Sequence, residues 1–333
     1  MRIGLFLGTQ ISLDGSLAQQ MRESAEQVGA ARDAGFDLIC SGQHFLTAPY
    51  RQATLLPFLA RMAAAAGDMR VAASVVLVPL HNPVALAEDI ATMDAICDGR
   101  FIFGLGLGYR DEEYAAFGIK ASERVGRMRE ALDVMRMLWA GGEVEHNGKY
   151  YHVPRVESAS LTTQKPHPPI WVAANDDNAI RRAARWGYPW LVNPHATMDM
   201  ISSQLKMYQS VMESAGKSVS ELPMMREAYI AEDRDLAYTE SRPYLESKYA
   251  AYAAWGQDKA LPGEEDFTQP YEDLARDRFL LGSPNEIVSE IRRYGDELGV
   301  TQMIFRMQWP GMSQQKMLRQ IELMGRDVIP KVT

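Results

Sequence analysis

The chain has 333 residues, of which 47% are apolar and 23% charged, so it is long enough and apolar enough to fold around a sizeable core. Its 43 acidic side chains outnumber the 35 basic ones, and the net charge of −8 comes without a cluster of Lys and Arg, which argues against nucleic acid and anionic membranes as partners. No window approaches the ~18 consecutive apolar residues of a membrane span.

Short apolar runs alternate with amphipathic segments along the chain, a pattern typical of strands and helices built around a parallel sheet. Strands are predicted at residues 3–8, 37–41, 71–78, 101–105, 170–174, 190–193, 224–231 and 303–307. Helices are predicted at residues 17–34, 83–96, 122–139, 177–186, 198–214 and 284–297, among others. Eight such units suit a (β/α)8 TIM barrel, with a doubly wound open sheet as the alternative. The first strand lacks the dinucleotide fingerprint, which favours the closed barrel.

Two intervals, 141–169 and 255–282, are too long for ordinary connections, so we interpret residues 1–333 as a single barrel domain with two insertions. The first contains a hairpin-like piece at 144–153 that turns at Asn147-Gly148. The second is rich in Pro, Gly and acidic residues. Such insertions serve either as lids over the active face or as surface elaborations, and both readings stay open.

The fourth predicted strand leads into three alternating glycines, Gly104, Gly106 and Gly108, followed by Tyr109. Because glycine lacks a Cβ, a planar ring or a phosphate can approach the main chain closely at such a place. The spacing differs from the Gly-x-Gly-x-x-Gly dinucleotide fingerprint. A cofactor site and a tight bend after the strand are therefore equal alternatives.

In a parallel barrel the chemistry lies at the carboxyl ends of the strands, so polar residues just after each strand are the candidates. His44 follows the second strand and suits general acid/base work, or it is a loop histidine bonded to the backbone. His81 is expected to be structural, beside the helix cap Asn82. The other candidates for the active face are Asn193 and His195 after the sixth strand, Arg226, Glu227 and Tyr229 on the seventh strand, and Arg306, Gln308 and Trp309 after the eighth.

The segment 175–178, Asn-Asp-Asp-Asn, precedes a predicted helix after the fifth strand. The free amides of a helix N-terminus suit the phosphate of a mononucleotide. However, Asp176 and Asp177 are themselves good caps, and their charge opposes a phosphate unless Arg181 or Arg182 compensates. The two readings conflict, and both stay open.

The familiar signatures of self-sufficient chemistry are missing from the sequence. The six histidines are dispersed without metal-site spacing, and neither a Gly-x-Ser-x-Gly elbow nor a Walker pattern occurs. Cys40 and Cys97 lie in apolar surroundings and are expected to be core residues. The chain opens into a strand without a signal-peptide pattern, so a reducing cytoplasm is expected. We infer that a bound organic cofactor carries the chemistry and that no metal does.

Several linked motifs resemble the luciferase-like monooxygenases, a family that includes bacterial luciferase, related flavin-dependent oxygenases and deazaflavin (F420) enzymes. They span nearly the whole chain, at residues 34–37 with 43–45, 77–83 with 87–89, 99–101 leading into 104–108, 113–114 with 117–118, 165–170, 183–187 and 281–284. The resemblance implies a (β/α)8 barrel, usually dimeric, that binds reduced FMN or F420 at the carboxyl ends of the strands. In the flavin oxygenases, reduced flavin adds O2 at its C4a carbon, and the resulting peroxide attacks the substrate.

The resemblance also assigns residues. His44 matches the family's active-site histidine, an acid/base or peroxide-stabilising group. The peptide between Ser74 and Val75 falls where the family has a non-prolyl cis bond forming a bulge behind the isoalloxazine ring. The cofactor-binding residues implied in this way are Ser74, Val75, Gly104, Gly106, Leu107, Gly108, Tyr109, Asn175, Asp176, Asp177, Asn178 and Ala179.

Two departures bear on the cofactor. Leu107 stands where luciferase-type members have an arginine that contacts the flavin, and Asp176-Asp177 stand where many relatives have small hydroxyl residues. An apolar residue at the first position is common in deazaflavin members, so F420 remains the alternative. We favour FMN, because His44-Phe45 and residues 306–312 look like those of oxygenase relatives.

The resulting hypothesis is a cytoplasmic, homodimeric two-component monooxygenase. It takes reduced FMN from a separate flavin reductase and, with O2, oxygenates a small or medium apolar organic molecule. The alternatives are an F420-dependent hydride-transfer oxidoreductase and a non-catalytic flavin-binding barrel.

Overall fold

The central sheet is a closed ring of parallel strands in the computed structural model, which describes residues 1–261 and 265–333. In ring order the barrel strands are β1 (Arg2–Phe6), β3 (Leu38–Ser41), β5 (Arg70–Leu77), β6 (Phe101–Gly106), β9 (Ile170–Ala173), β10 (Trp190–Leu191), β11 (Pro223–Ile230) and β13 (Gln302–Arg306). A bridge between Val192 and Met224 joins β10 to β11, and β13 pairs with β1. The predicted (β/α)8 barrel is confirmed, and each predicted strand overlaps an observed one.

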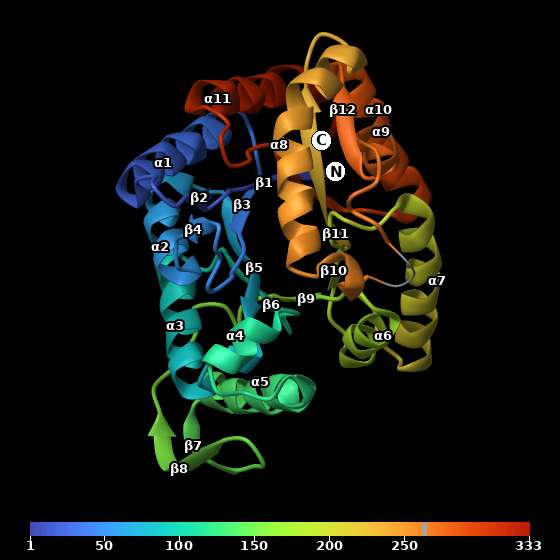
Figure 1. The fold of residues 1–333 in the computed structure, drawn as a ribbon. Coiled ribbons are helices and arrows are strands. Elements are labelled where there is room, and N and C mark those ends of the chain that lie inside the picture. Colours follow the sequence, from blue (N-terminus) through green and yellow to red (C-terminus); the bar gives the residue numbers. More distant parts are fainter. Residues whose placement is uncertain (262–264) are drawn as a thin grey trace.

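Helices surround the ring (Figure 1). The longer ones are α1 (Leu17–Asp33), α2 (Leu55–Ala66), α3 (Pro83–Ile96), α5 (Arg124–Ala140), α6 (Asp177–Trp186), α7 (Met198–Ser214), α8 (Arg234–Ala254), α10 (Pro284–Leu298) and α11 (Gln314–Leu323). Local sequence explains several of the boundaries. Asn82 caps α3 just before Pro83, and Ser283 forms a capping box with Glu286 at the start of α10.

Alternate strand residues fill the barrel interior in layers. One buried cluster inside the ring consists of Leu38, Cys40, Ala72, Ile102, Trp171, Leu191 and Ile304. Four partly buried residues pack on this cluster, namely Phe6, Val75, Ala173 and Met225. Burial raises the pKa of the Cys40 thiol to about 12, so this cysteine is a packing residue, as expected. Cys97 is also buried and forms no disulfide.

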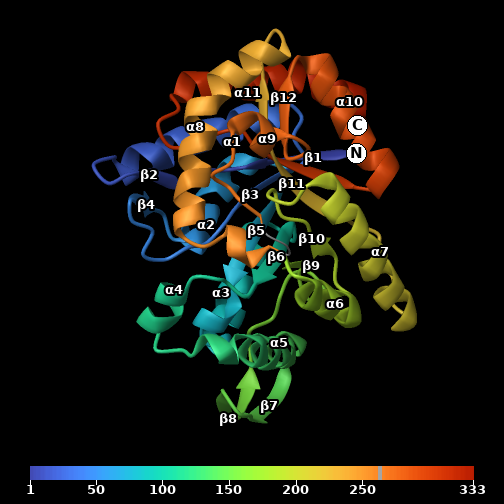
Figure 2. The ribbon, with the colours of Figure 1, turned by 45° about the vertical axis from the view of Figure 1, so that its right-hand side comes forward.

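The first insertion forms an antiparallel hairpin of β7 (Gly142–Asn147) and β8 (His152–Ser158), as predicted. Figures 1 and 2 show this hairpin on the far side of α5 from the barrel. Glu130 of α5 holds it, because the Glu130 carboxylate accepts hydrogen bonds from the backbone N–H groups of Lys149, Tyr150 and Tyr151. Of the two readings of this insertion, the surface elaboration is correct.

The second insertion contains elements that the sequence did not predict. After α8 come a 3-10 turn (Asp258–Ala260), α9 (Tyr271–Ala275) and β12 (Phe279–Gly282). β12 pairs with the second half of β11, at Glu227 to Ile230. Figure 2 shows the end of α8 and the segment after it beside the ends of β5 and β6. This insertion therefore reaches the carboxyl end of the barrel.

We expect Glu130→Ala to lower the free energy of unfolding by about 1–3 kcal/mol near neutral pH, because three backbone N–H groups lose their acceptor. Burial raises the pKa of Glu130, but the hydrogen bonds from Tyr150 and Tyr151 and the nearby His146 outweigh it, so the pKa lies below its usual value. A carboxyl group with a depressed folded-state pKa stabilises the fold above its unfolded-state pKa and loses this effect as the pH falls through the folded value.

Urea unfolding at neutral and acidic pH measures this effect. The difference between variant and wild type should shrink on acidification. Glu157→Ala is the control, since Glu157 lies exposed on the same hairpin. Equal losses in the two variants would contradict the role given to Glu130.

Candidate active site

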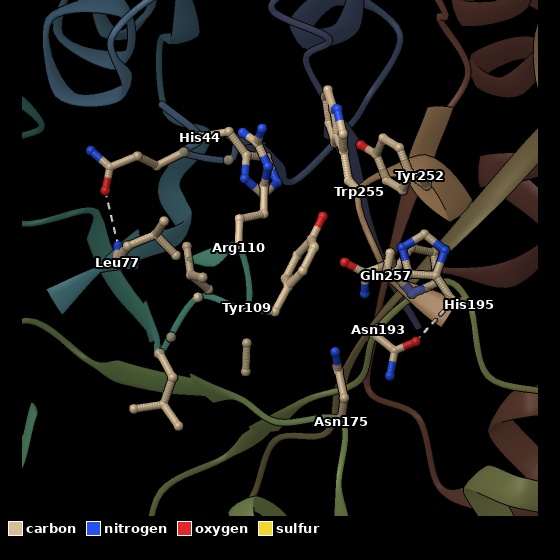
Figure 3. Close-up of a pocket in the computed structure, with 18 of the residues that line it drawn as sticks. His44, Leu77, Tyr109, Arg110, Asn175, Asn193, His195, Tyr252, Trp255 and Gln257 are labelled. Carbon is tan, nitrogen blue, oxygen red and sulfur yellow. Dashed lines mark hydrogen bonds between the residues drawn. The ribbon is translucent and has the colours of Figure 1, made fainter. Parts of the chain in front are cut away.

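A cavity of about 650 Å3 opens at the carboxyl ends of the strands. Its floor is the outermost layer of the barrel interior, formed by Phe6, Val75, Ala173 and Met225. Its walls carry polar side chains from several strand ends and from the segment after α8 (Figure 3). The volume lies within the ~300–1,000 Å3 typical of small-molecule sites.

A bulge in β5 raises Val75 into this floor. The pairing of β5 with β6 shifts register between Ala73 and Val76, and the Ser74-Val75 peptide is cis, as the resemblance implied. The glycines of β6 make room for the bulge. A Cβ on Gly104 would overlap the carbonyl oxygen of Ala73, and one on Gly106 would lie 2.7 Å from Cγ2 of Val75.

These contacts change the interpretation of the glycines. Gly104 and Gly106 allow β5 and β6 to approach each other closely. Gly104 lies under the bulge and does not line the cavity. Gly106, Leu107, Gly108 and Tyr109 do line it. The alternatives drawn from the sequence thus apply to different members of the same motif.

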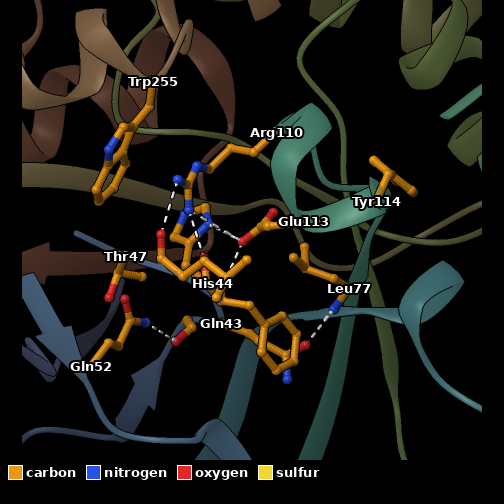
Figure 4. Close-up of polar contacts among 12 residues, drawn as sticks. Gln43, His44, Thr47, Gln52, Leu77, Arg110, Glu113, Tyr114 and Trp255 are labelled. Atoms are coloured by element: carbon orange, nitrogen blue, oxygen red, sulfur yellow. Dashed lines mark hydrogen bonds and ion pairs between the residues drawn. The ribbon is translucent and has the colours of Figure 1, made fainter. Parts of the chain in front are cut away.

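His44 lies on the cavity wall and is held by a buried carboxylate (Figure 4). Its Nδ1 is 3.2 Å from Oε1 of Glu113, a residue of α4 (Asp111–Ala116) with no exposed surface. The backbone N–H of Phe45 donates to the same oxygen at 2.8 Å. With Nδ1 engaged, Nε2 of His44 remains for a ligand. The arrangement suits proton transfer and disfavours the reading of a loop histidine bonded to backbone.

Arg110 and Trp255 connect the two sides of the cavity mouth. The Arg110 guanidinium donates to the carbonyl oxygens of Phe45 (2.7 Å) and Leu46 (3.2 Å) and lies 4.7 Å from the centroid of the Trp255 ring. Trp255 also donates from Nε1 to the carbonyl oxygen of Ala48 at 3.3 Å. The second insertion is therefore tied to the loop after β3 and covers part of the active face, which supports the lid reading for this segment.

His81 has a structural role, as the sequence suggested. Its Nε2 is 3.1 Å from Oε1 of Gln43, which also accepts a hydrogen bond from the backbone N–H of Leu77 at 2.9 Å. Burial lowers the pKa of His81, and the residue does not line the cavity. His81 thus helps to fix the loop that carries His44.

The segment before α6 lies at another edge of the cavity. Asn175, Asp176 and Ala179 line it, whereas Asp177 and the exposed Asn178 do not. Asp176 accepts a hydrogen bond from the backbone N–H of Ala179 at 3.0 Å, so the cap reading is correct for Asp176. Asp177 instead contacts Nε2 of Gln204 at 3.2 Å.

Two arginines lie near this cap. Burial lowers the pKa of Arg182 and outweighs the nearby Asp176, which raises it, while Arg124 lowers it further. Arg124 lines the cavity, although the sequence did not suggest it. Arg124 and Leu107 line the same cavity.

The opposite wall comes from the C-terminal half of the chain. His195, Lys248, Tyr252 and Arg306 line it. Figure 3 shows Tyr252 and His195 on this wall. Arg306 and His195 were candidates because they follow strands, but Lys248 and Tyr252 sit inside α8 and were missed. Their spacing of four residues on one helix face is the signal that was available.

Five residues that line the cavity each have a buried polar atom without a hydrogen-bond partner within the described residues. These atoms are the Oε1 of Gln52, the Oγ of Ser74, the OH of Tyr109, the Nε of Arg110 and the Nδ2 of Asn193. Such orphaned groups suit a planar heteroaromatic ligand with carbonyl and N–H groups. Within residues 1–261 and 265–333, no three His, Cys, Asp or Glu side chains are grouped so that they could hold a metal. The residues fit an organic ring cofactor better than a metal.

We expect Gly104→Ala to destabilise the fold by about 3 kcal/mol, because the new methyl group would overlap a backbone oxygen that cannot rotate away. The control is Gly29→Ala in α1, where an added Cβ meets nothing within 4 Å and should stabilise the helix by up to about 1 kcal/mol. Urea unfolding of both variants measures the difference. A fully stable Gly104→Ala protein would contradict the packing described for the bulge.

No helix in the described part of the chain is long and apolar enough to cross a membrane.

Comparisons with known proteins agree with this geometry. The family model described as luciferase-like monooxygenase matches residues 1–302. The oxygenase component of a flavin-dependent trigonelline monooxygenase from Acinetobacter baylyi is 27% identical, over 99% of this chain and 95% of its own. An F420-dependent glucose-6-phosphate dehydrogenase from Gordonia bronchialis is 29% identical over 93% of each chain.

Among solved structures, the monooxygenase RslO1 from Streptomyces bottropensis superposes with a TM-score of 0.87 at 24% identity, over all of both chains. Because the family model covers far more than half of the sequence, and the fold is that of its solved neighbour, the chain belongs to the luciferase-like monooxygenase family.

Proposed function

We propose that this protein is the oxygenase component of a two-component monooxygenase that uses reduced FMN. A separate flavin reductase supplies the reduced FMN, and the substrate is a small or medium organic molecule with an apolar body. When bound, reduced FMN supplies the activation of O2. The protein supplies the cavity, the orientation of the ring and a proton-transfer group.

The observation that carries this proposal is the His44–Glu113 pair on the wall of a cavity whose floor includes the Ser74-Val75 bulge. Buried Glu113 orients the imidazole and leaves Nε2 of His44 to hold or deliver a proton beside a ring lying on Val75. The apolar floor suits both a flat ring and an apolar substrate. A purely structural histidine would not need an orienting carboxylate at the edge of an open cavity.

The same cavity offers groups for the rest of the cofactor. Ser74 and Asn193 would bind polar atoms of the ring, since each has a buried polar atom that meets no partner among the described residues. Arg124 would balance the charge of a phosphate next to Asn175 and the start of α6. The glycine wall at Gly106 and Gly108 leaves room between these two regions.

An F420-dependent hydride-transfer oxidoreductase is the second candidate. Leu107 in place of an arginine and the self-capping Asp176 both weaken the case for FMN. Relatives of similar identity include both the flavin-dependent monooxygenase and the F420-dependent dehydrogenase above. The relative from the trigonelline monooxygenase is described as an oxygenase component, and this supports the proposal of a separate reductase for the present protein. We further propose, from the family resemblance, a single-domain homodimer in the cytoplasm.

Titration with both cofactors separates these readings. We expect reduced FMN to bind and to react with O2 in stopped-flow mixing, with oxygen consumption in the absence of any F420, because the His44 wall provides the proton-transfer group that oxygen chemistry needs. Tight F420 binding without FMN binding would move the protein to hydride transfer. FMN binding without oxygen consumption would leave a non-catalytic flavin-binding barrel.

His44→Ala should lower turnover by about 100- to 10,000-fold while leaving FMN affinity nearly unchanged, because it removes a proton-transfer group and not a large binding surface. Glu113→Gln should cause a smaller loss, since it leaves the imidazole in place without its orienting carboxylate. Steady-state oxygen consumption and flavin fluorescence titration give the two quantities. His152→Ala, on the exposed face of the hairpin, is the matched histidine control.

A further inference from the structure

Arg306 is a buried cation without a buried anion to match it. Its side chain is only 6% exposed, yet it lines the cavity. It donates to neutral oxygens only: the hydroxyl of Tyr252 at 3.1 Å, Oε1 of Gln10 at 3.1 Å and the carbonyl of Gln308 at 3.3 Å. No carboxylate of the described residues comes within the 4.0 Å of an ion pair. One N–H on each terminal nitrogen of the guanidinium has no protein acceptor there.

The carboxylate opposite Arg306 on the neighbouring strand, Glu227, is already engaged. Glu227 pairs with Lys248 through one oxygen, and its other oxygen accepts a hydrogen bond from Nε1 of Trp309 at 2.7 Å. Glu227 and Lys248 are both almost completely buried. Glu227 forms its direct ion pair with Lys248, and its charge also raises the pKa of the neighbouring Arg306, so one buried carboxylate is shared by two buried cations.

The surroundings of this wall add more positive charge. Arg226 donates to Tyr294, to Asn193 and to Ala196, all through neutral oxygens. Burial and the cations Lys248, Arg306, Arg226 and Arg278 hold the pKa of His195 well below its usual range, so His195 is neutral. Arg278 pairs with Glu265. Four cations thus face two carboxylates among the residues that the structure describes.

The pKa of Tyr252 is lowered by the same positive charges. Burial raises the pKa of Tyr252, but Arg306 and Lys248 outweigh it and bring the pKa below its usual value. The hydroxyl accepts from Arg306, so its own proton is directed to another acceptor. We call Gln10, Lys248, Tyr252 and Arg306 the basic lobe of the cavity. A charge buried without a partner costs several kcal/mol, so a ligand that brings an anion would be bound strongly at this lobe.

We propose that the basic lobe binds a carboxylate of the substrate, received by Arg306 and the hydroxyl of Tyr252. This inference rests on the proposed monooxygenase function and narrows the substrate class to organic acids with an apolar body. The acid group would lie at the wall formed by α8 and β13, and the apolar part would extend from there toward the His44 wall. Figure 3 shows His44 and His195 on opposite sides of the cavity, with Tyr109 between them.

Calorimetric titration of the cofactor-free protein tests the lobe with benzoate and its neutral isostere benzamide. Wild type should bind benzoate about 10- to 100-fold more tightly than benzamide, and Arg306→Gln should abolish that preference. Lys259→Gln is the matched control, because Lys259 lines the same cavity but is exposed. The control should keep the preference for benzoate.

Tyr252→Phe provides a second variant if Arg306→Gln does not fold, as judged by circular dichroism. It keeps the ring that stacks on Trp255 at 5.4 Å and removes only the hydroxyl, so benzoate binding should weaken severalfold and benzamide binding should not change. Equal binding of the two probes by wild type would overturn the proposal. So would an equal loss of benzoate binding in Lys259→Gln and Arg306→Gln.

FMN titrations of the same proteins separate this proposal from the proposed function. Arg306→Gln should retain the FMN affinity of wild type. Competition between FMN and benzoate would assign the basic lobe to the cofactor and overturn the carboxylate proposal. A benzoate preference in a protein that binds no FMN would uphold the lobe as a carboxylate site and reject the flavin monooxygenase.

Discussion

The close approach of β5 to β6 at Val75 determines the form of the candidate site. Two strands can come this near only because Gly104 and Gly106 carry no side chain where the bulge presses against them. The bulge in turn raises Val75 into the layer that closes the barrel interior and forms the cavity floor. The pocket above is therefore a consequence of backbone packing, and its floor is apolar and flat where a ring would lie.

The two walls of the cavity have different chemical characters. The wall from the first half of the chain presents a histidine oriented by a buried carboxylate, His44 with Glu113. The wall from the second half presents buried cations, Lys248 and Arg306, with a tyrosine between them. A protein with a net charge of −8 thus concentrates positive charge at one internal surface. Because burial strengthens electrostatic interactions, this local excess matters more for recognition than the overall charge.

The segment after α8 joins these walls. Trp255 follows α8, which carries Lys248 and Tyr252, and it contacts the loop of His44 through Arg110 and Ala48. Movement of this segment would therefore affect the proton-transfer side and the basic lobe together. Such coupling is one way for a barrel to exclude water from a reaction that uses a protected intermediate.

By itself, the sequence determined the barrel and most of the residues near the cofactor region. The strand and helix periods are local properties, so all eight strands and the starts of α3, α6, α7 and α10 were predictable. Residues that follow strands were found for the same reason, including His44, Asn175 and Arg306. Only the tertiary structure decided which of them share one cavity, and it left Gly104, Asp177 and Asn178 outside it.

The tertiary structure also brought together hydrogen-bond partners from distant segments of the chain. Glu113 reaches His44 across 69 positions, and Arg306 meets Gln10 across 296, separations that no local pattern encodes. Lys248 and Tyr252 looked like ordinary helix residues until α8 was placed at the mouth of the barrel. Charge balance depends on such distances in space, so the unmatched cation at Arg306 was decided by the fold and not by the order of residues.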